Sequence, residues 1–147
     1  MSSLLVRSAD RICALPLAAV TETMRELECV PCRDVPVWVR GASVVRGHAV
    51  PVVDLSVLLG GVRSETRGRF VTIRSGSGTV ALLVDEIVGV RNLANMPDAS
   101  RTPLLEAADA NHGSQLGTLD GQLLAVLDVA SILPEELHTK IVTESRA

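Results

Sequence analysis

The sequence predicts a mostly β protein made of two similar halves, and three observations support this prediction. Residues 47–60 (GHAVPVVDLSVLLG) align with 121–134 (GQLLAVLDVASILP) without a gap. Upstream of each copy, CALPLAAV (13–20) and ALLVDEI (81–87) share an apolar character. Short apolar segments also follow one another at regular spacing with turn residues between them, which favours small barrels over a βαβ architecture. A repeat on so short a chain predicts two paired β-rich subdomains.

The composition limits the classes of function. The chain has 147 residues, enough for a substantial core, and only Trp38 and Phe70 are aromatic, so that core is aliphatic. A net charge of −3 and the lack of aromatic stacking platforms argue against a nucleic-acid partner. The longest apolar run contains Asp54 and is shorter than the roughly 18 residues that span a bilayer, so we expect no membrane insertion. The start of the sequence lacks a signal-peptide pattern and three cysteines cannot all pair, so we expect a reduced, cytoplasmic protein.

Local patterns place the strands and turns. Apolar runs bounded by Gly, Pro or polar residues predict strands at 4–7, 12–17, 37–45 and 48–55, two strands around the SGSG turn (75–78), and a hairpin in 115–128. EIVGV (86–90) alternates and is expected to extend the strand before it. The hairpin tips are Arg46-Gly47 and Asp120-Gly121, where glycine can take a positive φ.

The remaining segments are expected to be turns, loops and a tail. SVLL (56–59) and VASIL (129–133) fit short closing turns, and the prolines or polar residues of 30–36, 62–69 and 92–113 predict loops. PEELHTKIVTESRA (134–147) fits either a partly helical tail or a frayed one. We expect one domain over 1–147: strands of about 1–15 and 68–134, together with 16–67, are distributed over the two subdomains, and 135–147 form the tail.

One helix is expected, over residues 18–28. Val20, Met24 and Leu27 recur at i, i+4 and i+7, the spacing of an amphipathic helix of two to three turns. Its opposite face would carry the acidic residues Glu22, Glu26 and Glu28. A charged helix face is most often simply solvated, but it can also contact a partner.

The reactive residue types form no catalytic pattern. Asp54, Asp85 and Asp128 each end an apolar strand, and because the repeat carries the same aspartate twice, we interpret them as caps of the following turn. Cys29 and Cys32 form a C-x-x-C motif, which leaves a metal or redox role open. This motif follows the expected helix, however, so no helix N-terminus would lower a thiol pKa. The other candidate ligands, Cys13, His48, His112 and His138, show no paired spacing. We therefore expect no enzyme, no metal site and no cofactor.

An arginine at a hairpin tip is the remaining candidate. Arg46 lies beside Gly47, with Gly41 five residues earlier. Such an arginine is usually solvated, yet arginine is also a residue type favoured for anchoring a protein partner.

The chain resembles the CheW family, the coupling proteins of bacterial chemotaxis. The matching motifs are ICALPLAAVTE (12–22), WVRGASVVRGHAVPVVDL (38–55), VALLVDEIVGV (80–90) and LGTLDGQLLAVLDVASIL (116–133). They occur in the family's order and at its spacing, over roughly residues 4–134. The resemblance implies two intertwined five-stranded SH3-like β-barrels with one or two short helices.

The resemblance also implies a function and a binding surface. It implies a non-catalytic adaptor that links the cytoplasmic tip of a methyl-accepting chemoreceptor to the regulatory domain of a CheA-type histidine kinase, and that is recruited to membrane-bound receptor arrays. Receptor binding in the family uses the groove between subdomains, and the positions that match it here are Val20, Glu22, Gly41 and Arg46. The kinase would bind through barrel-on-barrel packing, and the residues of that interface are unknown.

The hairpin departs from the family pattern. The family usually has Gly-x-x-Asn-Leu-Arg-Gly, whereas residues 41–47 read Gly-Ala-Ser-Val-Val-Arg-Gly, so Val44 replaces a side-chain amide. Thr23 also stands where the family usually has a larger apolar residue. These changes leave open an alternative, a divergent scaffold for a non-flagellar signalling array.

Overall fold

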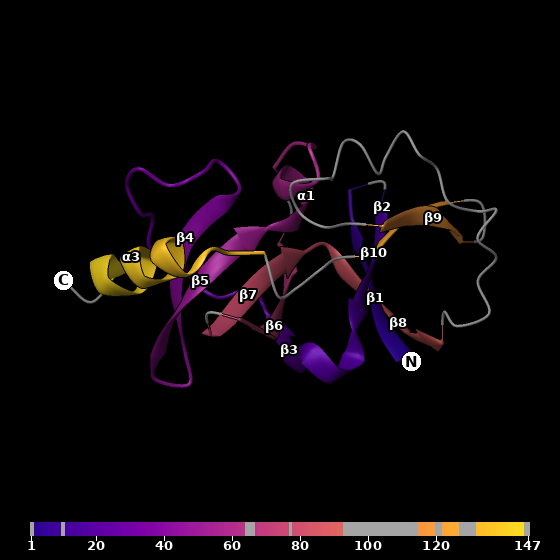
Figure 1. The fold of residues 1–147 in the computed structure, drawn as a ribbon, viewed down its shortest axis with the longest axis horizontal. Helices are drawn as coiled ribbons and strands as arrows, with labels where there is room; N and C mark the ends of the chain where they lie inside the picture. The colour runs from indigo at the N-terminus through magenta and orange to yellow at the C-terminus, as the bar shows by residue number, and fades with distance from the viewer. Residues whose placement is uncertain are drawn as a thin grey trace.

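The computed structural model describes residues 2–9, 11–63, 67–76, 78–92, 115–119, 122–126 and 132–145. Ten strands in this part of the chain form two five-stranded sheets (Figure 1). Sheet A has the order β8-β1-β2-β10-β9 and contains β1 (Ser2–Ser8), β2 (Arg11–Pro16), β8 (Glu86–Asn92), β9 (Gln115–Leu119) and β10 (Gln122–Val126). Sheet B has the order β3-β6-β7-β5-β4 and contains β3 (Val20–Arg25), β4 (Val39–Val45), β5 (His48–Asp54), β6 (Arg69–Ser75) and β7 (Gly78–Val84).

The two sheets have the same topology. In each, a central antiparallel hairpin (β1–β2, β6–β7) pairs in parallel with one strand of a second hairpin (β10 in sheet A, β5 in sheet B), and a fifth strand (β8, β3) covers the other edge. The aligned segments at 47–60 and 121–134 therefore supply β5 and β10, and those at 13–20 and 81–87 supply β2 and β7. This confirms the two similar β halves.

Each half gives one strand to the other. The chain leaves β2 of sheet A through a 3₁₀ turn (Leu17–Ala19) and enters sheet B as β3, while it leaves β7 of sheet B at Asp85 and enters sheet A as β8. Asp85 makes this second crossing at the tip of the β1–β2 hairpin, since its N–H donates to Arg7 O (2.9 Å) and its carboxylate accepts from Ala9 N (2.8 Å). The expected intertwining is confirmed, and the expectation that EIVGV extends the preceding strand is wrong.

The expected helix over 18–28 is also wrong, because Val20–Arg25 is the exchanged strand β3. Half-buried and exposed residues alternate along it, and Val20, Glu22 and Met24 are the half-buried ones. A register shift after Val20 puts Val20 on the core cluster shared with sheet A and Met24 on the cluster around Phe70. Two of these three also fit a helical spacing, and the glutamate between them breaks the apolar alternation that identifies a strand. Pairing with β6 decides the outcome.

Sheet B is buried on both faces. One face shares a core cluster with sheet A, in which Leu4, Val6 and Leu15 join Val71 and Leu82. The opposite face packs around Phe70, which is fully buried, with Val52, Ala81 and Leu83 among its neighbours. Burial on both faces explains why β5 and β7 read as nearly continuous apolar runs.

The sheet edges β3 and β4 are not paired with each other as strands. The segment that follows β3 reaches β4 through one bridge, in which Val30 and Ala42 exchange two backbone hydrogen bonds of 2.8 and 3.0 Å. The loop expected at 30–36 is confirmed, and it lies against this edge.

Two α-helices complete the described structure. Asp54 begins α1 (Leu55–Leu58), where its carboxylate accepts from Val57 N at 3.4 Å, as the cap interpretation predicted. The tail forms α3 (Glu135–Ser145), which packs against β4 and β5 with Ile141 fully buried (Figure 1). The predictions for 93–113, the Asp120-Gly121 turn, Asp128 and residues 129–131 lie outside the described residues.

Candidate partner-binding groove

Sheet B and α3 enclose a groove of about 630 Å³. Its lining comes from five elements: Thr21 and Glu22 of β3, Thr72 of β6, Thr79 of β7, residues 45, 46 and 48–50 of the β4–β5 hairpin, and His138 and Val142 of α3. The resemblance implied a groove between the two subdomains, whereas this groove lies between sheet B and α3. The lining is mixed apolar and polar, which suits a protein surface better than a small ionic substrate.

The hairpin tip places Arg46 at the rim of the groove. Val45 pairs with His48, so Arg46 and Gly47 form a two-residue turn, and both have a positive φ, 50° and 81°. Turns with positive φ at both positions match the twist of the flanking strands. The predicted tip is confirmed, and the Arg46 side chain is 78% exposed.

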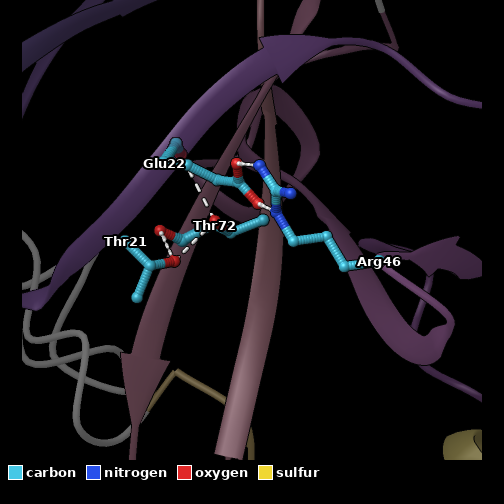
Figure 2. Close-up of polar contacts among 4 residues, drawn as sticks. All are labelled: Thr21, Glu22, Arg46 and Thr72. Carbon is cyan, nitrogen blue, oxygen red and sulfur yellow. Dashed lines mark hydrogen bonds and ion pairs between the residues drawn. The ribbon is translucent and has the colours of Figure 1, made fainter.

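Arg46 and Glu22 form a two-point ion pair across the rim (Figure 2). Arg46 Nε donates to Glu22 Oε1 at 2.7 Å and Nη2 donates to Oε2 at 2.6 Å. This contact lowers the pKa of Glu22 and raises that of Arg46, the hydrogen bond being the larger cause in each case. The pair fixes the orientation of a planar guanidinium whose remaining donors face solvent.

A bulge in β3 brings Glu22 to this position. The register of β3 on β6 shifts between Val20 and Glu22, so that Thr21 has no strand partner. Instead, Thr21 Oγ1 lies 2.6 Å from Thr72 Oγ1 and donates to Thr72 O at 3.0 Å, as Figure 2 shows. The two threonines were not predicted from the sequence. The only sequence signal that bears on Thr21 is the alignment of 13–20 with 81–87, which indicates that equivalent elements follow these two segments.

A second charged cluster lies deeper in sheet B. Arg40 Nε is 3.4 Å from Asp54 Oδ2, and Arg40 Nη1 is 3.8 Å from Glu26 Oε2. Glu26 also accepts from Gly68 N at 2.9 Å. Of the three glutamates expected on an exposed helix face, two are therefore engaged with arginines, and only Glu28 is exposed. This cluster holds the end of β3 and the start of α1 together.

Helix α3 forms one wall of the groove and is fixed at several points. His138 Nε2 lies 3.2 Å from Thr79 O. Lys140 Nζ donates to Arg33 O and Asp34 O, both at 2.8 Å, and Glu144 accepts from Arg33 N at 3.0 Å. From the sequence, His138 is only a candidate metal ligand. Its place in the groove depends on how the tail folds back onto sheet B, which no local pattern indicates.

The other two predicted receptor-facing residues have different surroundings. Val20 is half-buried and packs against the shared core. Gly41 is buried at a bulge in β4, with a φ of 136°, and a Cβ there would lie 2.0 Å from Val30 O. The structure thus brings Glu22 and Arg46 together, whereas Gly41 allows close approach of the neighbouring backbone.

The C-x-x-C thiols lack the properties of a redox pair. The pKa values of Cys29 and Cys32 are both raised, mainly because the thiols are partly buried. A reactive thiolate needs a lowered pKa instead. Among the described residues, no three His, Cys, Asp or Glu side chains are grouped as metal ligands. Nor does any helix in this part of the chain have the length and apolarity needed to cross a membrane.

Comparisons with known proteins agree with the fold. The CheW-like domain family matches residues 2–137. Protein PilI of Pseudomonas aeruginosa is 30% identical over 104 residues, which cover 69% of this chain and 58% of PilI. Chemotaxis protein CheW of Rhizobium meliloti is 28% identical over 134 residues, which cover 88% of this chain and 85% of that protein.

A solved structure has the same architecture. The scaffolding protein TtCheW from Thermoanaerobacter tengcongensis aligns with a TM-score of 0.73 at 18% identity, over 90% of this chain and 91% of TtCheW. With the family match over nearly the whole sequence, these comparisons establish the family. The chain belongs to the CheW-like domain family.

Proposed function

We propose that the protein is a non-catalytic adaptor that holds the cytoplasmic tip of a methyl-accepting chemoreceptor close to the regulatory domain of a CheA-type histidine kinase. Membership of the CheW-like family supports a chemotaxis-type scaffold. Such a role needs a rigid platform with two separate surfaces, and two sheets joined by exchanged strands supply one. In this proposal, binding to receptors recruits the protein to membrane-bound arrays.

The observation that carries the proposal is the Glu22–Arg46 pair at the rim of the groove. Arg46 is exposed, a half-buried Glu22 holds its guanidinium through two hydrogen bonds, and the pair borders both apolar and polar lining residues. Arginine is one of the residue types enriched among those that contribute most to protein interfaces. We propose Arg46 and Glu22 as direct receptor contacts, Val20 as the residue that anchors β3 beneath them, and Gly41 as a positioning residue.

Charge reversal at Arg46 tests this proposal. Arg46→Glu places two carboxylates side by side, so we expect affinity for the receptor tip to fall by about tenfold or more. Binding of the CheA regulatory domain should change less than about twofold, since rim charges outside an interface contribute little. Isothermal titration with each partner separately gives both values.

Arg91→Glu is the matched control, because Arg91 is an exposed arginine on β8 of sheet A, outside the groove. Receptor affinity should be unchanged in this variant. If Arg46→Glu weakened both partners equally, the surface assignment would be wrong; if the unmodified protein bound neither partner, the adaptor function would be wrong. Measuring affinity for each receptor tip of the source organism shows which receptors the protein binds. Those receptors indicate whether it serves a flagellar or a non-flagellar pathway.

The metal or redox alternative has its own test. A double variant, Cys29→Ser with Cys32→Ser, should keep its receptor and kinase affinities within about twofold, because both thiols lie outside the groove lining. Bound metal in the purified protein, or loss of binding on oxidation that the double variant abolishes, would favour the alternative.

A further inference from the structure

A second concavity, of about 270 Å³, is lined by the β4–β5 hairpin, the segment after β3 and Ser145 of α3. We call four apolar residues of this lining the outer-face patch: Leu27, Val30, Val44 and Ala49. Val44 is 70% exposed, Val30 59% and Leu27 38%. Single exposed apolar residues are ordinary, but a group of them in one concavity indicates an interaction surface.

Strand geometry explains why Val44 points outward. Ser43 and Val45 on either side of it are buried, so Val44 projects to the opposite face of β4. Its register partner is Ala49 of β5, which is half-buried. Ala42, two residues earlier on the same face, is buried in the core cluster shared with sheet A. Among the described residues, the patch is therefore the exposed continuation of a face that is buried farther along the strand.

The patch is preformed. The segment that carries Leu27 and Val30 is held on β4 by the two hydrogen bonds of the Val30–Ala42 bridge and by Ser43 Oγ, which donates to Glu28 O at 2.6 Å. Gly41 makes this close approach possible, since any Cβ would overlap Val30 O. A partner would not have to order these residues, which reduces the entropic cost of binding.

The patch is continuous with the proposed receptor surface. Ala49 lines both the outer-face patch and the groove that contains Arg46 and Glu22. A partner that contacts Arg46 at the hairpin tip therefore reaches Val44 by passing over Ala49, without a second binding event.

We propose that the outer-face patch binds an apolar side chain of the same receptor tip that contacts Arg46, with Val44 as a specificity-determining residue. This inference rests on the proposed function. It predicts a contact in two parts, a charged part at the hairpin tip and an apolar part on the hairpin's outer face. Receptor tips that place an apolar residue against Val44 would be preferred over tips that place a charged residue there.

The test compares two substitutions of equal shape. Val44→Thr keeps the β-branched side chain but replaces a methyl with a hydroxyl, and it should weaken receptor-tip binding roughly fourfold or more, the effect of about one buried methyl group. Val62→Thr is the control, because Val62 is 81% exposed and lies outside the patch. Its affinity should equal that of the unmodified protein. Thermal unfolding of each variant checks that both remain folded.

The outcomes separate this inference from the proposed function. Unchanged affinity in Val44→Thr, together with loss in Arg46→Glu, would overturn the apolar contact and leave the adaptor function in place. Equal weakening by Val44→Thr and Val62→Thr would also overturn it, because the effect would not be specific to the patch. If the unmodified protein failed to bind the receptor tip, both proposals would fall.

Discussion

Sheet A and sheet B share a strand order, but they differ at the two positions that meet in the groove. In sheet B, the bulge after Val20 places Glu22 on the rim; in sheet A, the corresponding shift in β8 follows Ile87 and places Gly89 at the equivalent point. The two residues between the paired strands are Arg46-Gly47 in sheet B, and the sequence between β9 and β10 in sheet A is Asp120-Gly121. Neither member of the ion pair thus has a counterpart in the other copy of the repeat.

In the proposed function, this difference gives a protein with two similar halves a single receptor-binding face. The shared features with a described structure serve folding: Gly47 forms a turn, Asp54 caps α1, and the apolar patterns form the two sheets. The residues that the halves do not share, Glu22 and Arg46, lie at a rim and contribute little to the core. We therefore expect substitutions of shared features to affect stability and substitutions of unshared ones to affect binding.

Two glycines at bulges, one in each sheet, provide the largest expected contrast in stability. Gly41 and Gly89 both have a positive φ, 136° and 148°, so alanine at either costs roughly 1–3 kcal/mol of backbone strain. At Gly41 the new Cβ would also overlap Val30 O, whereas nothing lies within 4 Å at Gly89. In urea unfolding, Gly41→Ala should be less stable than Gly89→Ala by about 1–3 kcal/mol. Equal losses would show that the Val30 segment moves away without cost.

The repeated aspartates test whether equivalent positions have equivalent roles. Asp54 caps α1, so Asp54→Ala should lower the free energy of unfolding by about 1–2 kcal/mol. If Asp128 caps the turn that follows it, Asp128→Ala should give a similar loss in the same urea titration. A loss of stability at Asp54 alone would show that the two equivalent aspartates do not have equivalent roles.

The smallest expected effect is on the pH dependence of the ion pair. Arg46 lowers the pKa of Glu22 in the folded protein. The contribution of Glu22 to stability is therefore present above its unfolded pKa and lost as the pH falls through the lower, folded value. Solvent screening keeps this contribution small. In an NMR titration of the side-chain carboxyl, Arg46→Ala should raise the midpoint of Glu22 toward the ordinary value; an unchanged midpoint would mean that the pair does not form in solution.

The sequence predicted the architecture well because both copies of the repeat kept their apolar pattern. It failed at the exchanged strands. In β3, the half-buried residues include Glu22, and a bulge at Thr21 shifts the alternation, so no regular apolar pattern marks this edge strand. The helical spacing of Val20, Met24 and Leu27 was coincidental, because Leu27 lies beyond the strand.

The candidate site was predictable only in part, for a similar reason. Arg46 stands at a turn that two adjacent residues define, so a local pattern identified it. The other contacts join residues that are far apart in the sequence: 24 positions for Glu22 and Arg46, 51 for Thr21 and Thr72, and 59 for His138 and Thr79. Only the strand exchange and the return of α3 bring these residues together, and neither leaves a local signal in the sequence.

The most direct test of the central claim is to map the receptor-tip surface by NMR on the isotope-labelled protein. Our account predicts that backbone amide shifts on addition of the receptor tip concentrate in sheet B, at Thr21, Glu22, Thr72 and the turn at Arg46. It predicts little change in β8, where Val88 and Val90 are exposed on the edge of sheet A. Shifts concentrated in β8, with the Arg46 turn unchanged, would contradict it.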